Sequence, residues 1–274
     1  MKSSNSIGKV VMYTILILGA IVMIVPFIWM ILTSGKTLTE STLIPPVIFP
    51  EEFRFENYTR VWNQLPFLAF YINTFLMILG RVIGSVMFSA MAAFAMAKLN
   101  FPGKRLFMII VLTQLMIPPQ VFLTPQYLIA QSLGILNSVG ALIMPGIVSA
   151  FGTFLLRQHF MSLPDELGES AYMDGASVWT VFYKIYLPLA KSGITALAIF
   201  TALFAYRDLL WPLIANRSLT ELPLSAGLAN LQGQFSTNYP ELMAGSVLAI
   251  IPMVILFLVF QKQFTQGIAT TGGK

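Results

Sequence analysis

Residues 10–33 have the sequence VVMYTILILGAIVMIVPFIWMILT, an apolar run of 24 residues without a charged side chain. A helix needs about 20 such residues to cross the hydrocarbon core of a bilayer. Lys2 and Lys9 precede the run, as basic residues do in a secretory signal peptide. The run is longer than the roughly 7–15 apolar residues of such a signal, and no small-residue cleavage site follows it. We therefore expect a retained first membrane span.

Five further stretches have the same apolar character, at residues 67–97, 106–130, 139–156, 193–215 and 242–260. Only Arg81 interrupts the second stretch, and only Arg207 and Asp208 interrupt the fifth. Continuous apolar runs indicate helices, because the strands of a β-barrel are shorter and alternate in polarity. The sequence predicts an all-α polytopic membrane protein with six transmembrane helices, forming a single domain over residues 1–274.

The composition excludes several other classes of protein. Hydrophobic residues make up 57% of the 274 and charged residues only 10%, where a soluble domain carries about 25%. The chain is too apolar to be disordered, and it has no cysteine for a disulfide-stapled fold. A net charge of +5 would suggest nucleic-acid binding only if the basic residues formed a patch.

The basic residues instead predict the orientation of the helices in the membrane. With six spans both termini lie on one side, and ten Lys and Arg residues fall on that side: Lys2, Lys9, Lys98, Lys104, Arg105, Arg157, Lys184, Lys191, Lys262 and Lys274. Only Lys36, Arg54, Arg60 and Arg217 fall on the other side. Because cytoplasmic loops are enriched in Lys and Arg, we expect cytoplasmic N and C termini and no nucleic-acid partner.

Three connections between the spans are long. The outer loop 34–66 contains Pro45, Pro46 and Pro50 and cannot be one continuous helix. A second outer loop covers 216–241, and the cytoplasmic segment covers 157–192. No phosphate-cradling Gly-rich loop occurs in any of them, so any energy source must be a partner or a gradient.

The cytoplasmic segment contains SLPDELGESAYMDGASVW at residues 162–179. Ser162 and Asp165 have the spacing of a capping box, which predicts a helix to about Asp174. Gly175 can adopt the left-handed conformation that ends a helix. Ser177 can cap a second helix through about Tyr186, which Pro188 stops or kinks. Such a bent helix pair can rest on the membrane surface, or it can dock a cytoplasmic protein.

This segment resembles the "EAA" loop of ABC importer permeases, in which E-A-A is followed after three residues by G and after nine more by I-x-L-P. The chain has Glu169, Ala171, Gly175, Ile185, Leu187 and Pro188 at that spacing, with Ser170 in place of the middle Ala. Further similar stretches are FRFENY at 53–58, FLLRQ at 154–158, DLLWPL at 208–213, QGQ at 232–234 and Gln263-Phe264-x-x-Gly267. Overall the chain resembles the shorter, six-helix permease of maltose-type sugar importers, although Tyr206-Arg207 stands where that family has Trp-Asn.

The resemblance implies a set of partners. They are a second, homologous permease subunit, two ATPase subunits that bind ATP and Mg, and an extracellular sugar-binding protein, assembled in a bacterial or archaeal plasma membrane. It implies that the ATPase is coupled through Glu169, Ser170, Ala171, Asp174, Gly175, Ala176 and Trp179, and that Gln232, Gly233 and Gln234 contact the binding protein. The chain itself would bind no cofactor and would not be an enzyme.

Polar residues inside the spans are candidates for a solute path, because a buried charge or amide in a membrane is costly. They are Asn73, Arg81, Gln114, Gln120, Gln126, Tyr206, Asp208 and Trp211. Amide side chains both donate and accept hydrogen bonds, as binding of hydroxyl groups requires. Each of these residues can instead hold two helices together. An Arg81–Asp208 pair is compatible with the sequence, and Pro118, Pro119 and Pro125 should break the third span.

Two alternatives to a binding-protein-dependent importer remain open at this point. A stand-alone channel or secondary transporter would use intramembrane acids as ion sites, and Asp208 is the only one. A membrane-embedded enzyme would need a catalytic constellation, whereas His159 is the only histidine and no metal or nucleophile site can be built on it.

Overall fold

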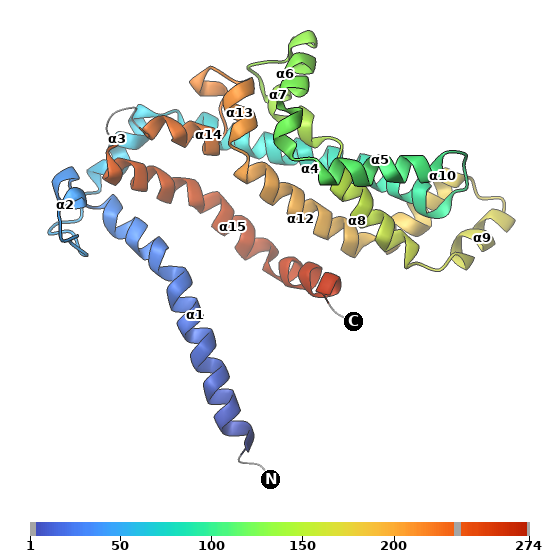
Figure 1. The fold of residues 1–274 in the computed structure, drawn as a ribbon, viewed down its shortest axis with the longest axis horizontal. Coiled ribbons are helices and arrows are strands. Elements are labelled where there is room, and N and C mark those ends of the chain that lie inside the picture. Colours follow the sequence, from blue (N-terminus) through green and yellow to red (C-terminus); the bar gives the residue numbers. More distant parts are fainter. Residues whose placement is uncertain (1–3, 233–236, 273–274) are drawn as a thin grey trace. The chain divides into compact units, whose positions relative to one another are not determined.

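The computed structural model describes residues 4–232 and 237–272, which are helical throughout apart from their connections (Figure 1). The long helices are α1 (Ser4–Ser34), α4 (Phe67–Lys98), α5 (Lys104–Met116), α8 (Ala150–Met161), α12 (Lys191–Arg207) and α15 (Tyr239–Gly272). The shorter ones are α2 (Leu38–Thr42), α3 (Glu56–Gln64), η1 (Pro119–Phe122), α6 (Leu123–Ser132), α7 (Val139–Ile143), η2 (Met144–Gly146), α9 (Glu166–Met173), α10 (Val178–Val181), η3 (Phe182–Tyr186), α11 (Leu187–Leu189), α13 (Leu210–Ala215), η4 (Leu219–Glu221), α14 (Leu224–Leu228) and η5 (Ala229–Leu231).

Three of these helices are long and apolar enough to cross a membrane, and the number rises to six if each of three bent helix pairs is one span. The three are Gly8–Ser34 of α1, α4, and Tyr239–Gln261 of α15. They confirm the helices expected at 10–33, 67–97 and 242–260. The side chains of α1 along residues 8–28 are exposed, and most of them are apolar, as in a helix that faces lipid or another subunit.

The third and fourth expected spans are broken. In place of one helix over 106–130, α5 and the following η1–α6 segment meet at 105°. Ile117 is extended, as a residue before proline must be, so Pro118 and Pro119 end α5 as predicted. The prediction for Pro125 was wrong, because it lies in the first turn of α6, where a helix needs no N–H donor. The segment expected at 139–156 bends by 43° between residues 146 and 150 and continues to Met161.

The fifth expected span, 193–215, is interrupted between α12 and α13. Pro212 explains the break, because its ring excludes the carbonyl group four residues earlier, that of Asp208. That carbonyl instead accepts a hydrogen bond from the Ser225 hydroxyl at 2.5 Å. Asp208 is extended, with ψ of 115°. The charged residue therefore lies in a non-helical joint.

The chain divides into two compact units, of which the larger comprises residues 67–227 and the segment from Ile255. In this unit α4, α8 and α12 lie side by side (Figure 1) around buried Ala90, Phe94, Leu156, Phe160, Tyr186 and Leu197. A Cβ atom on Gly152 of α8 would lie 2.6 Å from Ser89 Oγ and 2.9 Å from a Leu197 methyl carbon. Glycine at 152 thus allows the three helices to approach closely, as small residues do in membrane bundles.

The other unit comprises the described residues up to Pro66 together with 228–254. Its loop after α1 is held by Asn57, whose amide donates to the carbonyls of Ser34 and Lys36 at 2.8 and 2.9 Å. Hydrogen bonds from the backbone N–H groups of Glu51 and Thr37 lower the pKa of Glu40. Helices α2 and α3 are separate, which confirms that the proline-rich loop is not one helix.

Candidate functional site

The segment after α8 begins differently from the capping box that the sequence predicted. The Ser162 hydroxyl donates to the His159 carbonyl at 2.7 Å and so belongs to the end of α8. Asp165 precedes α9 in a helical conformation and makes no side-chain capping bond. Its carboxylate is bonded by Lys98 of α4 instead. A contact between residues far apart in the chain has replaced the local cap.

The bend between α9 and α10 has the predicted geometry. Gly175 has a φ of +82°. Its N–H donates to the Tyr172 carbonyl at 3.0 Å, and the Ala176 N–H donates to the Ala171 carbonyl at 2.9 Å, the two bonds of a Schellman motif. Ser177 Oγ then accepts from the Thr180 N–H at 3.2 Å and caps α10. We refer to residues 166–181 as the helix–glycine–helix tip.

The helix that follows the tip continues further than expected. The π-helical turn η3 leads into α11, which contains Pro188. Because proline lacks an N–H and crowds the preceding turn, a wider turn before it relieves the conflict. The axis then bends by 76° between residues 189 and 191. Pro188 therefore lies just before a kink, which confirms the second of the two predicted effects, and the helix does not stop at Tyr186.

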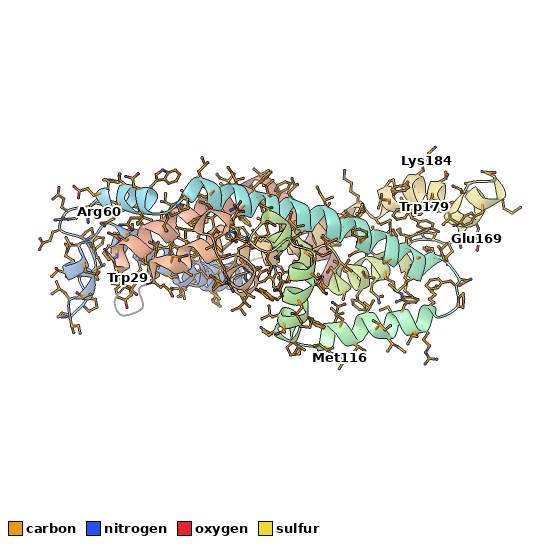
Figure 2. All side chains as sticks on the ribbon, turned by 90° about the horizontal axis from the view of Figure 1, so that it is seen from above. Trp29, Arg60, Met116, Glu169, Trp179 and Lys184 are labelled. Atoms are coloured by element: carbon orange, nitrogen blue, oxygen red, sulfur yellow. The ribbon has the colours of Figure 1, made fainter. Side chains whose placement is uncertain are left out.

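Apolar side chains project from the tip. Met173 is 88% exposed and Trp179 59% exposed, and Tyr172 and Val178 are also exposed. Ala171 and Ala176 instead pack against the core of the larger unit. Figure 2 shows Glu169, Trp179 and Lys184 gathered at one end of this unit, away from Met116. A Cβ atom on Gly175 would meet nothing within 4 Å, so the bend is not crowded within the chain. Exposed aromatic and methionine side chains beside an open backbone favour a docking surface.

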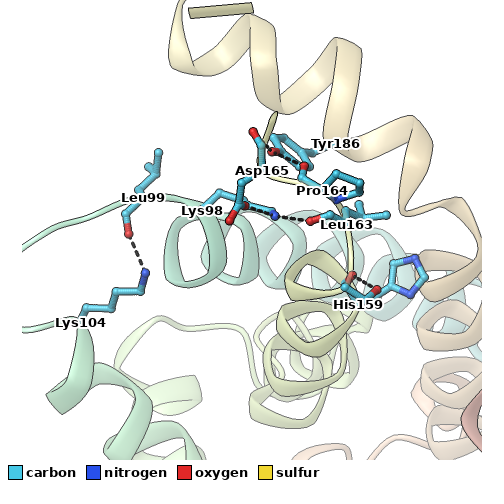
Figure 3. A network of polar contacts seen from close by, with 9 residues as sticks. Lys98, Leu99, Lys104, His159, Leu163, Pro164, Asp165 and Tyr186 are labelled. Carbon is cyan, nitrogen blue, oxygen red and sulfur yellow. Dashed lines mark hydrogen bonds and ion pairs between the residues drawn. The ribbon is translucent and has the colours of Figure 1, made fainter. Parts of the chain in front are cut away.

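A polar network ties the residues on either side of the tip to α4 (Figure 3). The Lys98 ammonium donates to the Leu163 carbonyl at 2.7 Å and to the Asp165 carboxylate, and it lies 5.0 Å from the centre of the Tyr186 ring. The Tyr186 hydroxyl donates to the Pro164 carbonyl at 3.1 Å. The Lys98 side chain is only 6% exposed. These charge-assisted bonds, made by a buried lysine to a largely exposed carboxylate, fix residues 163–165, which lead into the tip, to the end of α4.

A second feature is a cavity of about 740 Å³ at the joint between α12 and α13. Its polar lining residues are Arg81, Gln114, Gln120, Gln126, Ser149, Arg207 and Asp208. The aromatic residues Phe122, Phe151, Phe204 and Trp211 also line it. The break at Pro118 and Pro119 places the three glutamines, which come from α5, η1 and α6, around one space. Amides and aromatic rings together suit a hydroxyl-rich solute.

Arg81 and Asp208 form an ion pair in the wall of this cavity. Arg81 Nη1 lies 2.8 Å from Asp208 Oδ2, and Arg81 Nε donates to the Leu142 carbonyl at 2.7 Å. The Arg81 side chain is 8% exposed and that of Asp208 22%. The pairing that the sequence allowed is therefore present, across 127 residues of chain.

Two of the path candidates lie outside the cavity lining. The Asn73 amide donates to the carbonyls of Thr220 and Leu222 at 2.8 and 3.0 Å, so Asn73 holds α4 to the η4 segment. Tyr206 is not among the lining residues either. Trp211 lines the cavity, but its indole N–H is used by the Ala141 carbonyl at 2.8 Å. Arg207 and the three phenylalanines line the cavity but were not among the predicted path residues, although the position of Arg207 beside Asp208 was a usable signal.

Comparison with known proteins places the chain in a family. The sequence profile of the "binding-protein-dependent transport system inner membrane component" family matches residues 85–270. The chain belongs to this family. The match includes the helix–glycine–helix tip and most of the cavity. The family consists of transport permease components, so the chain is a transport protein and not an enzyme.

Relatives of this permease align along nearly their whole length. The arabinooligosaccharides transport system permease protein of Halalkalibacterium halodurans is 33% identical over 258 residues, covering 93% of this chain and 92% of the relative. The diacetylchitobiose uptake system permease protein of Streptomyces coelicolor is 30% identical, covering 97% and 89%. The sn-glycerol-3-phosphate transport system permease protein of Salmonella typhi is 32% identical, covering 93% and 94%.

A solved structure shows the same fold. It is described as a bacterial ABC transporter involved in the import of the acidic polysaccharide alginate. The TM-score is 0.80 at 24% identity, covering 96% of this chain and 98% of the other. The permease therefore has the all-helical fold of an ABC importer permease.

Of the three residues predicted to contact a binding protein, the structure describes one. Gln232 follows η5 and is exposed. Gly233 and Gln234 lie outside the described residues.

Proposed function

We propose that this permease is a transmembrane subunit of an ATP-driven, binding-protein-dependent importer of a saccharide or saccharide derivative. Family membership and the three relatives, which are named for arabinooligosaccharides, diacetylchitobiose and glycerol 3-phosphate, support the solute class. The observation that carries the coupling role is the exposed helix–glycine–helix tip, which follows directly on Leu163 and Asp165, the two residues bonded by Lys98 of α4.

The proposed topology is a single transmembrane domain of six spans with both termini in the cytoplasm of a bacterial or archaeal cell. The excess of Lys and Arg on the terminal side supports it. In this orientation the tip faces the cytoplasm, where an ATPase subunit would meet it. The outer loop 216–241, with Gln232, would face the extracellular sugar-binding protein.

In this function the tip acts as a lever. ATP and Mg bind in two ATPase subunits, and closure of their dimer moves the tip, whose coupling residues run from Glu169 to Trp179. Lys98 and Tyr186 pass the motion to α4, which also carries Arg81 in the cavity wall. The second, homologous permease completes the translocation path. The permease alternates between two conformations, one at each end of the transport cycle. ATP and the loaded binding protein shift the equilibrium between them.

A stand-alone channel or secondary transporter is the alternative. The exposed apolar tip argues against it, because such a protein has no partner that would cover Met173 and Trp179. Asp208, the acid such a mechanism would use, is already paired with Arg81.

Copurification tests the proposed function. The tagged chain, expressed with its chromosomal neighbours and extracted in mild detergent, should bring down a second permease and an ATPase subunit. Uptake should stop when ATP is depleted and should persist when the proton gradient alone is collapsed. An active chain that purifies alone, or uptake that follows the proton gradient, would contradict the proposal.

Lys98→Met should uncouple the tip while leaving the bundle folded. Methionine matches the length of the lysine stem but makes neither the Leu163 nor the Asp165 bond. We expect uptake to fall roughly tenfold, equivalent to about 1.4 kcal/mol, and amide exchange to accelerate in residues 162–175. Lys104→Met is the matched control, because the Lys104 ammonium donates to the carbonyl of Leu99, five residues away in sequence, and not to residues 163–165. Equal uptake in the two variants would show that the network does not transmit the motion.

A further inference from the structure

We propose that the cavity at the α12–α13 joint binds an anionic group, a carboxylate or phosphate, carried by the transported saccharide. The inference rests on the proposed function and specifies its solute class. The observation that supports the inference is the set of charged side chains that line the cavity, which are two cations and one anion.

The charged lining residues of this cavity are Arg81, Arg207 and Asp208. With both arginines protonated at all relevant pH values, the lining carries a net charge of +1. The C-terminal end of α12 supplies at most about half a negative charge near Arg207. The charged residues that line the cavity therefore leave one positive charge unbalanced.

The hydrogen bonds of Arg81 leave part of the guanidinium unused. Nε is bonded to Leu142 and Nη1 to Asp208, but Nη2 is buried without a hydrogen-bond partner. A buried Arg–carboxylate pair is commonly bidentate, whereas this one has a single bond of 2.8 Å. The donor capacity of Arg81 thus exceeds what Asp208 and Leu142 accept.

Arg207 supplies the second cation in an accessible form. Its side chain is exposed and lines the cavity. Within the described part of the chain, no ion pair or hydrogen bond engages its guanidinium. Asp208 cannot neutralise both arginines, because its one carboxylate is shared with Arg81. An anion entering the cavity would meet an arginine that is free to form a bidentate pair with it.

The rest of the lining matches a saccharide that carries such a group. Gln114 and Gln120 are exposed amides, and Gln126 is half-buried. Phe122, Phe151 and Phe204 provide apolar faces. A volume of about 740 Å³ lies within the range of small-molecule sites. The cavity therefore combines contacts for hydroxyl groups with contacts for one negative charge.

Thermal stability of the purified transporter, titrated with small saccharides, tests this inference. The probes are glucuronate, glucose 6-phosphate and neutral glucose, at constant sodium concentration and ionic strength. We expect glucuronate or glucose 6-phosphate, but not glucose, to raise the transition temperature of the wild type. The anion that succeeds identifies the group as carboxylate or phosphate.

Arg207→Gln should weaken this effect about tenfold in half-saturating concentration, because the lining becomes neutral. Arg207→Lys should retain most of it. Arg217→Gln removes the same charge from an exposed site outside the cavity and should change nothing. Anion binding by the ATPase subunits would be equal in all variants.

The inference is overturned if glucose stabilises the wild type as well as the anions do, if neither anion stabilises it, or if Arg207→Gln responds like the wild type. If the ATPase subunit still copurifies and uptake still depends on ATP in those cases, the proposed function stands and only the solute class is wrong.

Discussion

Gly175→Asp should reduce uptake to background while the chain still reaches the membrane in normal amounts. Gly175 has a φ of +82°, and a Cβ atom added to it would meet nothing within 4 Å beyond its own chain neighbours. A side chain there meets nothing until another protein covers the bend. In the proposed importer that protein is an ATPase subunit, and an added carboxylate would be pressed into the contact. Uptake of the solute and the amount of copurified ATPase are the measurements.

Gly175→Asp could reduce uptake through backbone strain or through a clash with a partner, and control variants distinguish the two causes. Gly103 is a matched control, because it has the same φ of +82° and a Cβ atom added to it would also meet nothing within 4 Å. It differs in its position, between α4 and α5. Gly103→Asp should leave uptake nearly unchanged. Gly175→Asn carries little backbone strain, since asparagine tolerates the left-handed region, and should still fail in uptake. If Gly175→Asn transported normally, the added charge and not the added bulk would explain the loss. If Gly103→Asp failed equally, strain and not docking would explain it.

The tip was largely predictable because its signals are local. Gly175 and Ser177 act within four residues along the chain, and the structure has both the Schellman motif and the cap of α10. The capping box at Ser162 and Asp165 failed for the opposite reason. Lys98, 67 residues away in sequence, donates to the Asp165 carboxylate. A local sequence pattern does not indicate that a distant residue will bind the capping side chain.

The cavity was predictable only in its components. Gln114, Gln120 and Gln126 were selected because amides are rare in apolar runs, and the proline break between α5 and α6 explains why they meet. Asn73 met the same criterion but serves the η4 segment. Composition does not distinguish a residue that lines the solute path from one that holds two helices together. The difference depends on which backbone carbonyl groups lie within hydrogen-bonding distance in the folded chain. The break at Asp208 was readable from Pro212, four residues later.

Asp208→Leu should destabilise the purified transporter by about 3 kcal/mol, because it leaves Arg81 buried without a counter-ion. The Arg81 side chain is 8% exposed and extends along Gly146, so it cannot easily reach water. Arg81→Met should cost less, because Asp208 is 22% exposed and can be hydrated. The measurement is the unfolding midpoint of the complex in detergent for each variant.

The double variant Arg81→Met with Asp208→Leu decides between pairing and packing. If the ion pair itself accounts for the cost, removing both charges should restore stability to within about 1 kcal/mol of the wild type, because an apolar pair replaces a buried ionic one at little loss. The control is Glu56→Gln, which breaks the exposed Arg60–Glu56 pair and should cost no more than about 0.5 kcal/mol. If the two costs of the single variants simply add in the double variant, Arg81 and Asp208 do not depend on each other.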